Sequence, residues 1–157
     1  MNPKNRQAVA ADDDTGLEFC LKLTRATLNT TRRLDKALSG LHGISFADFM
    51  MLYYLERAPG AKLRRVDLAE RLGLTASGVT RSLLPLEKLG LVSRPPDPRD
   101  ARVGYAVLTN SGHQLLGYSV TTVRAVARET TAAIPTGQIE GLSKLLAQMA
   151  GMNSSNS

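Results

Sequence analysis

The pattern of apolar and polar residues between positions 65 and 90 predicts two short helices joined by a tight turn. In both segments apolar residues recur at steps of three and four, which places them on one face of a helix. Gly73 stands where a left-handed turn would end the first helix, Thr75 can cap the second, and Gly90 can close it. The apolar positions are Val66, Leu68, Ala69 and Leu72, then Val79, Leu83, Leu86 and Leu89. This order is typical of a helix-turn-helix.

Two short stretches that favour strand follow the second helix, at residues 91–94 and 103–108. The loop between them, PPDPRDAR, is stiffened by prolines and carries arginines at its tip. Two helices followed by a hairpin with a basic tip predict a winged helix-turn-helix. The first turn of the second helix adds small, polar and basic groups, which suit a helix end that enters the major groove of DNA. These groups are Ser77, Gly78, Thr80 and Arg81.

Helical patterns flank this module on both sides. The predicted helices cover residues 16–40, 45–57 and 110–133, with a last helix that starts at 136 or 137, and a short strand is expected at 61–63. The fold class is therefore mainly α with a small β-hairpin wing. We expect a winged helix-turn-helix DNA-binding module at 45–108 and a helical dimerisation lobe formed by 16–44 and 109–150. Residues 1–15 are predicted to be a disordered N-terminal segment and residues 151–157 a flexible tail.

Several single residues are predicted to mark helix ends. Ser45, with Asp48 three residues later, resembles a capping box, and Thr109 is expected to cap the helix that follows the hairpin. Gly40 and Gly43 are expected to end the first helix. Pro85 removes a backbone hydrogen bond inside the second helix of the motif, so a kink is predicted there.

The charge distribution favours a polyanionic partner. The chain carries a net charge of +6, and residues 62–102 hold nine Lys and Arg against five Asp and Glu, which is +4 of that total. Cations gathered on one module favour DNA, because neutralising phosphates releases counterions. The chain has a single cysteine, no run of apolar residues long enough for a membrane span and no signal-peptide core. We therefore expect a cytoplasmic protein without a disulfide framework.

The order and spacing of these motifs resemble the multiple antibiotic resistance regulator (MarR) family. The matching stretches are DLAERLGLT at 67–75, VTR at 79–81, LEKLGLV at 86–92, DPRDAR at 97–102 and LTNSG at 108–112. The resemblance implies a homodimer whose two winged modules bind a pseudo-palindromic operator. It also implies a transcriptional regulator, in our interpretation a repressor, that responds to a small aromatic or lipophilic effector. Pro85 departs from the family pattern, in which this site is usually polar.

The resemblance and the residue chemistry together name candidate contacts. In the wing, the family pattern implies that Arg99 reaches the minor groove and that Asp97 orients it, which agrees with the attraction of arginine to narrow grooves. Lys62, Arg64 and Arg65 could contact flanking phosphates or simply be exposed. The predicted DNA-binding residues are Arg65, Thr75, Ser77, Gly78, Thr80, Arg81, Arg94, Asp97, Arg99 and Arg102. The predicted effector-binding residues are Arg25, Asn29, Met50 and Tyr53.

Two other functions stay open at this point. Cys20 lies near the start of the first helix, as in a branch of the family that senses organic hydroperoxides, although the tyrosines of that branch have no counterpart at Thr24 or Leu34. A buried, inert cysteine is the simpler interpretation. Alternatively, the winged module is a protein-interaction module, but its polar and basic helix end favours DNA. No motif indicates an enzyme, a metal site or a cofactor.

Overall fold

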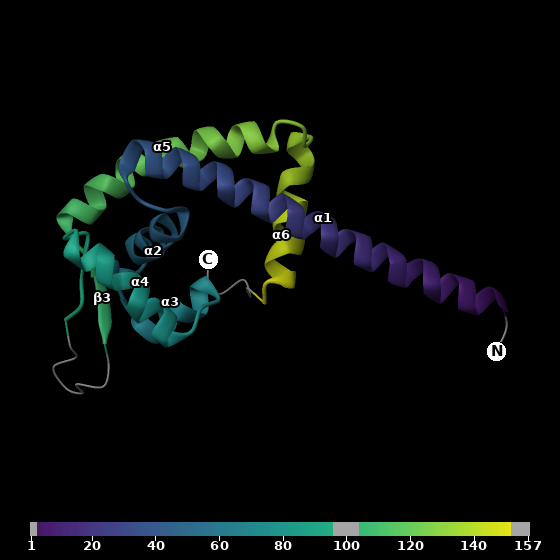
Figure 1. Cartoon of the computed structure of the whole chain (residues 1–157), viewed down its shortest axis with the longest axis horizontal. Helices are drawn as coiled ribbons and strands as arrows, with labels where there is room; N and C mark the ends of the chain where they lie inside the picture. Colours follow the sequence, from purple (N-terminus) through teal and green to yellow (C-terminus); the bar gives the residue numbers. More distant parts are fainter. Residues whose placement is uncertain (1–2, 96–103, 152–157) are drawn as a thin grey trace.

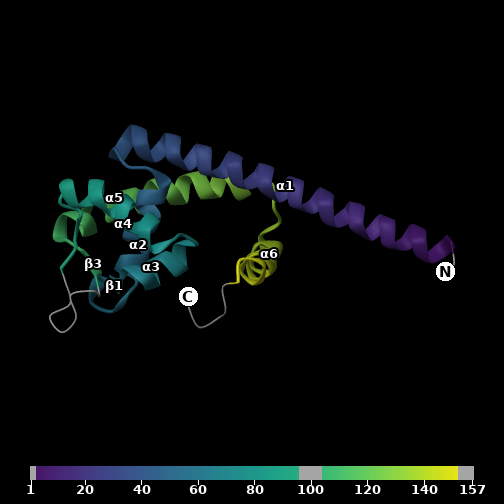
Figure 2. The same cartoon turned by 60° about the horizontal axis from the view of Figure 1, so that its bottom comes forward.

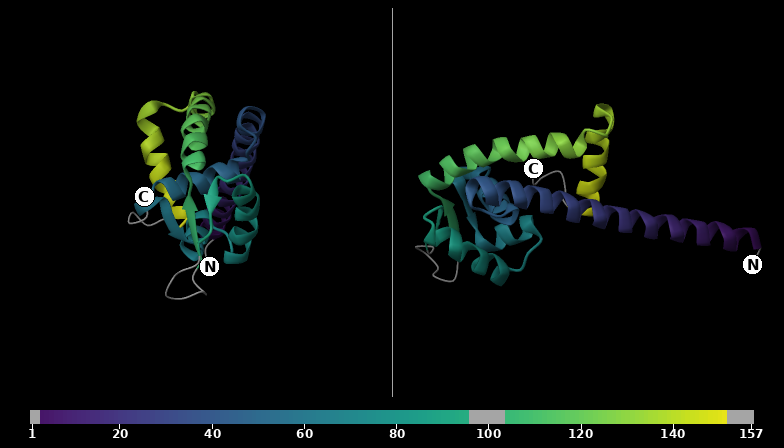
Figure 3. Two further views of the ribbon diagram at one scale, coloured as in Figure 1. Left: turned by 90° about the vertical axis from the view of Figure 1, so that its left-hand side faces the viewer. Right: turned by 45° about the horizontal axis from the view of Figure 1, so that its top comes forward.

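The computed structural model describes residues 3–95 and 104–151, with side chains from residue 14 onward. It is mainly helical with one small sheet, as the sequence predicts. The elements are α1 (Pro3–His42), α2 (Phe46–Glu56), a 3-10 turn (Pro59–Ala61), β1 (Lys62–Arg64), α3 (Arg65–Leu72), α4 (Ala76–Lys88), β2 (Val92–Ser93), β3 (Tyr105–Leu108), α5 (Asn110–Thr131) and α6 (Thr136–Met149). Figure 1 and Figure 3 show α1 and α5 running side by side, with α2, α3, α4 and the sheet gathered at one end of the pair.

The sheet has three antiparallel strands in the order β1-β3-β2. Lys62 of β1 lies opposite Val107, and Val92 of β2 lies opposite Leu108, so β3 pairs with both neighbours. Ala106 and Leu108 point into the core, and they fix which face of β3 is turned inward. The short strand predicted before α3 is confirmed as β1, and the hairpin strands predicted from the sequence are confirmed as shorter segments.

The helix ends follow the local signals in the sequence. Ser45 and Asp48 form the predicted capping box at the start of α2. Gly73 adopts a left-handed conformation at the end of α3, with φ of 64°. The Thr75 side chain accepts a hydrogen bond from the Gly78 backbone, and the Thr109 side chain accepts one from Gly112, so both predicted caps are confirmed.

The core lies where the inner faces of α2, α3 and α4 meet β3. Leu52, Leu68, Val79, Leu83 and Ala106 are completely buried there, each with no exposed surface. Burial of an apolar side chain contributes roughly 1.5–3 kcal/mol. The inner face of α4 is therefore fixed by packing, and this packing sets the direction in which its polar outer face points.

Two predictions about helix extent are corrected by the structure. The helix α1 begins at Pro3 and not at residue 16, so helix replaces the disorder predicted before that residue. The reason is that proline is tolerated in the first helical turn, and a single glycine at position 16 costs only about 1 kcal/mol. Gly40 lies inside α1, and the left-handed turn comes at Gly43. The helix α4 includes Pro85 and continues to Lys88, and the kink expected at Pro85 stays a prediction.

Gly112 is buried in the first turn of α5, against the wing sheet. A Cβ atom there would lie 2.2 Å from the Leu91 carbonyl oxygen and 2.6 Å from a Leu108 methyl group. The carbonyl belongs to the backbone and is held by hydrogen bonds from Thr109, so it has little freedom to move. We expect Gly112→Ala to lower the free energy of unfolding by about 1–3 kcal/mol in a urea titration.

Gly117→Ala is the matched control for this prediction. Gly117 lies in the same helix, and a Cβ atom there would meet nothing within 4 Å. Its replacement is expected to leave the free energy of unfolding unchanged or to raise it by up to about 1 kcal/mol, because alanine favours helix. Equal stability of the two variants would contradict the close packing of α5 against the sheet.

Candidate nucleic-acid interface

The outer face of α4 is polar, and its first turns are open to solvent. Ser77 and Arg81 are exposed, whereas Val79 and Leu83 on the opposite face are completely buried. Within the described part of the chain, Arg81 has no hydrogen-bonding or ionic partner. A cation without a partner on an exposed helix can contact the bases or phosphates of a duplex without first breaking an ion pair.

Hydroxyl groups organise the start of α4. The Thr75 hydroxyl accepts a hydrogen bond from the Gly78 backbone at 3.1 Å and lies 3.2 Å from the Ser77 hydroxyl. The Thr80 hydroxyl donates to the Ala76 carbonyl at 2.9 Å. Thr75 is thus committed to capping the helix, while Ser77 and Thr80 are placed on its accessible side, where hydroxyls can contact bases or phosphates.

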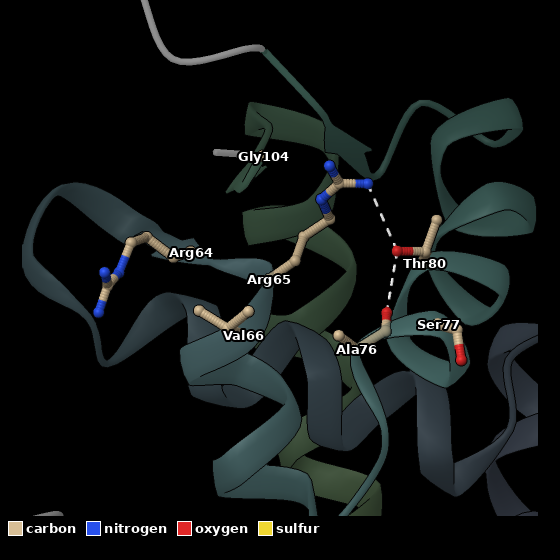
Figure 4. Close-up of a pocket in the computed structure, with 7 residues that line it drawn as sticks. All are labelled: Arg64, Arg65, Val66, Ala76, Ser77, Thr80 and Gly104. Carbon is tan, nitrogen blue, oxygen red and sulfur yellow. Dashed lines mark hydrogen bonds between the residues drawn. The ribbon is translucent and has the colours of Figure 1, made fainter. Parts of the chain in front are cut away.

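A notch separates the start of α4 from the base of the wing (Figure 4). Its volume is about 310 Å³. The Arg65 guanidinium lies inside it and donates a hydrogen bond to the Thr80 hydroxyl at 3.4 Å. The notch is lined by Arg64, Arg65, Val66, Ala76, Ser77, Thr80 and Gly104. The structure thus brings together three of the predicted DNA-binding residues, Arg65, Ser77 and Thr80.

The cations that flank the notch have partners of their own. Arg64 forms two hydrogen bonds to Asp67, at 2.7 and 2.8 Å, and these raise the pKa of its guanidinium above the usual value. The Lys62 ammonium lies 3.8 Å from the centre of the Tyr105 ring, a cation–π contact. Both side chains remain exposed. These contacts hold the Lys62 and Arg64 side chains in defined orientations at the protein surface.

Arg94 is held more firmly than the sequence indicated. Its Nε donates to a Glu87 carboxylate oxygen at 2.7 Å, and the two side chains form an ion pair between the start of the wing and α4. Only 23% of the Arg94 side chain is exposed. In this arrangement Arg94 joins the start of the wing to α4. A contact of its guanidinium with DNA would compete with the ion pair to Glu87.

The remaining predicted wing residues, Asp97, Arg99 and Arg102, lie outside the described residues. The strands that carry this loop are described, and the Tyr105 backbone donates to the Pro95 carbonyl at 3.4 Å, which closes the hairpin. Gly104, where the chain re-enters the described part, was not predicted to belong to the site. A glycine next to a strand signals a close approach of another group, and this signal could have identified it.

The predicted effector residues are divided between two helices. Arg25 is exposed on α1, and Asn29 accepts a hydrogen bond from Arg32 at 3.2 Å. On α2, Met50 is half-buried, and Tyr53 stacks on Phe49 with ring centres 5.8 Å apart. None of these residues lines the notch beside α4. Cys20 is exposed, contrary to the buried cysteine that was the simpler interpretation of the sequence.

The geometry defines a class of protein. A helix-turn-helix with an uncovered polar helix, a notch lined by arginines beside that helix and a hairpin wing are the parts of a winged-helix DNA-binding regulator. No helix in the described residues has the length and apolar character needed to cross a membrane.

Comparison with known proteins agrees with this class. A sequence model described as "MarR family" matches residues 42–103, which span the end of α1, α2, the helix-turn-helix and the wing loop. No curated protein sequence is significantly similar to the chain. Together with the solved structures described next, this match supports a MarR-family winged-helix regulator.

Solved structures extend the likeness over most of the chain. Sco3205 from Streptomyces coelicolor, a MarR family transcriptional regulator in complex with DNA, has a TM-score of 0.79 at 24% identity, over 85% of this chain and 84% of that chain. A mutant MarR from E. coli complexed with operator DNA has a TM-score of 0.77 at 25% identity, over 87% and 96%. CouR from Rhodococcus jostii RHA1, bound to p-coumaroyl-CoA, has a TM-score of 0.74 at 25% identity, over 84% and 91%.

Proposed function

We propose that this protein is a homodimeric repressor of the cytoplasm that binds a pseudo-palindromic DNA operator and is released by a small effector. The observation that carries the proposal is the outer face of α4, where Arg81 is exposed and unpaired within the described residues while the inner face is anchored in the core. A rigid, solvent-facing helix with a free guanidinium is the form that major-groove recognition requires.

The proposed contacts divide into base readers and backbone contacts. Arg81 can form two hydrogen bonds to a guanine, and Ser77 and Thr80 can serve bases or phosphates. Lys62 and Arg64, exposed beside the notch, are placed to contact flanking phosphates. Phosphate contacts set the register of the protein on the duplex, whereas base contacts supply the specificity.

Apolar surface on the terminal helices supports a homodimer. No residue of α6 is buried, although its Leu142, Leu145, Leu146 and Met149 share one face. On α1, Leu17, Leu21 and Leu28 are each at least 60% exposed. Figure 2 shows the N-terminal part of α1 extending beyond the rest of the chain. A second copy would cover this surface and place two α4 helices on half-sites about 34–36 Å apart.

An effector would act by favouring one spacing of the two winged modules. CouR, which is similar in structure, was solved with p-coumaroyl-CoA bound. We propose an aromatic or lipophilic effector that binds between the helical lobe and the winged module, near Arg25, Asn29, Met50 and Tyr53. It can release DNA only if it binds more tightly to an arrangement of the dimer that does not fit the operator.

A redox-sensing repressor is a second candidate, and the exposure of Cys20 favours it. A sensing thiol must be accessible to the oxidant and must be deprotonated at neutral pH. Measuring the rate of thiol alkylation against pH would decide between the candidates. A Cys20 pKa above about 8, with no loss of DNA binding after treatment with peroxide, would remove this alternative.

Selection of bound DNA from a random duplex pool tests the proposed function. We expect enrichment of one inverted repeat, and repeating the selection with aromatic acids, acyl-CoA thioesters and a peroxide would identify the signal that releases it. Failure to enrich any sequence over the starting pool at physiological ionic strength would contradict sequence-specific binding.

Arg99→Ala is expected to weaken binding to the selected duplex by about 1–3 kcal/mol, because an arginine in a narrow minor groove is lost. The free energy of unfolding should not change, since the substitution shortens one side chain and leaves the core residues as they are. Fluorescence anisotropy gives the affinity, and Lys22→Ala on α1 is the control for loss of one positive charge. Unchanged affinity of Arg99→Ala across a salt titration would show that the wing does not contact DNA.

A further inference from the structure

The Arg65 side chain spans the gap between α4 and the base of the wing. Its backbone N–H donates to the Gly104 carbonyl at 2.9 Å, and its Nη1 donates to the Thr80 hydroxyl at 3.4 Å. Arg65 is half-buried, in contrast to its exposed neighbour Arg64. Figure 4 shows the two side chains pointing in different directions, with only Arg65 directed toward Thr80 and Gly104.

Gly104 provides the space that Arg65 occupies. A Cβ atom at position 104 would lie 1.8 Å from Nη2, 2.1 Å from Nε and 2.2 Å from Cζ of Arg65. No side chain can share this space with the guanidinium. Because the clashing atoms are the end of a flexible side chain, a methyl group at position 104 would displace the guanidinium without forcing the backbone to move.

The Thr80 hydroxyl is arranged to accept the hydrogen bond from Arg65. Its hydrogen is directed to the Ala76 carbonyl at 2.9 Å, so its oxygen has lone pairs available for the guanidinium. The planar guanidinium can contact the Gly104 backbone on one side and the threonine on another, which a lysine ammonium cannot do in the same way.

We propose that Arg65 is a positioning residue that fixes the base of the wing relative to α4, and that it acts on DNA through Thr80 and the wing and not by contact with a phosphate. This inference rests on the proposed DNA-binding function. It gives Arg65 a different task from Lys62 and Arg64, whose exposed side chains are the proposed phosphate contacts. It also gives Gly104 a role, because the missing side chain leaves room for the Arg65 guanidinium.

A double-mutant cycle with the full-length protein tests this assignment. The four proteins are the wild type, Arg65→Met, Gly104→Ala and the double variant, each titrated with the duplex selected above. We expect each single substitution to weaken binding about tenfold, and the double variant to bind within about twofold of Arg65→Met, because both remove the same contact. Gly117→Ala, which adds a methyl group in open space, should bind as the wild type does.

The salt dependence of binding separates positioning from a phosphate contact. Loss of one phosphate contact would reduce the slope of log K against log salt by about 0.9, whereas loss of a positioning contact should leave the slope unchanged. Arg65→Lys keeps the positive charge but lacks the planar guanidinium, so it should bind the duplex as weakly as Arg65→Met does. Additive effects in the cycle, a reduced slope, or recovery of affinity with lysine would each overturn the assignment.

Amide chemical shifts of the free protein keep this test separate from that of the proposed function. Arg65→Met and Gly104→Ala should both shift the amides of Thr80 and Tyr105, and thermal unfolding should show that both variants remain folded. If the wild type binds no duplex, the proposed function fails, but the chemical shifts still show whether Arg65 contacts Thr80 and Gly104. If the wild type binds DNA but the shifts and the cycle show no coupling, only the assignment of Arg65 fails.

Discussion

Replacing Leu145 by lysine is expected to convert the protein to a monomer and to weaken binding of its selected duplex by about 100-fold or more, because the advantage of linked half-sites is lost. Leu145 is 58% exposed on α6, a helix without any buried residue. Leu142, Leu146 and Met149 lie on the same face, so a partner would cover all four side chains. An ammonium group placed there would have to be buried without a counter-ion, which is strongly unfavourable.

Gln148→Lys is the matched control for this experiment. Gln148 is exposed on α6 and is not one of the four apolar residues, so its replacement adds the same charge without removing an apolar side chain. Sedimentation equilibrium gives the mass of each variant, and fluorescence anisotropy gives its affinity for the duplex. A Leu145→Lys protein that remains dimeric and binds as tightly as Gln148→Lys would show that α6 does not hold the dimer together.

The second large effect is expected at Leu83, on the inner face of α4. Its side chain has no exposed surface, and it packs in the core beneath the polar face that is proposed to bind DNA. We expect Leu83→Ala to lower the free energy of unfolding by about 2–5 kcal/mol, through lost burial and the cavity that remains.

The adjacent Leu84 offers a control with the same change in side chain. Its side chain is 41% exposed, so Leu84→Ala should lower the free energy of unfolding by less than about 1 kcal/mol. Urea titrations followed by circular dichroism give both values. An equal loss of unfolding free energy in the two variants would contradict the orientation of α4, and with it the outward direction of Ser77 and Arg81.

Local chemistry explains why the helix ends of the winged module could be predicted from the sequence. Gly73, Thr75 and Thr109 act within three or four residues of their own position, so the spacing of side chains is sufficient to recognise them. The start of α1 differs from the prediction because the segment before residue 16 is polar but contains no strong helix breaker after Pro3. Polarity predicts exposure, and it does not by itself predict disorder.

The contacts inside the candidate site could not be predicted in the same way. Arg65 meets Gly104 only because β1 pairs with β3, which brings together residues far apart in the chain. The ion pair of Arg94 with Glu87 likewise depends on how the wing folds back toward α4. Periodicity identified which residues face outward, but the choice between a DNA contact and an internal contact depends on tertiary geometry.

The central claim is that two copies of this chain hold one specific duplex through paired α4 helices and wings. Its most direct test is a titration of the full-length protein with the enriched inverted repeat and with a shuffled duplex of equal composition, at about 0.15 M salt. The mass of each complex is measured alongside the affinity. The account predicts two chains on the inverted repeat and a preference of about 10³ or more over the shuffled duplex. A single chain per duplex, or equal affinity for both duplexes, would contradict it.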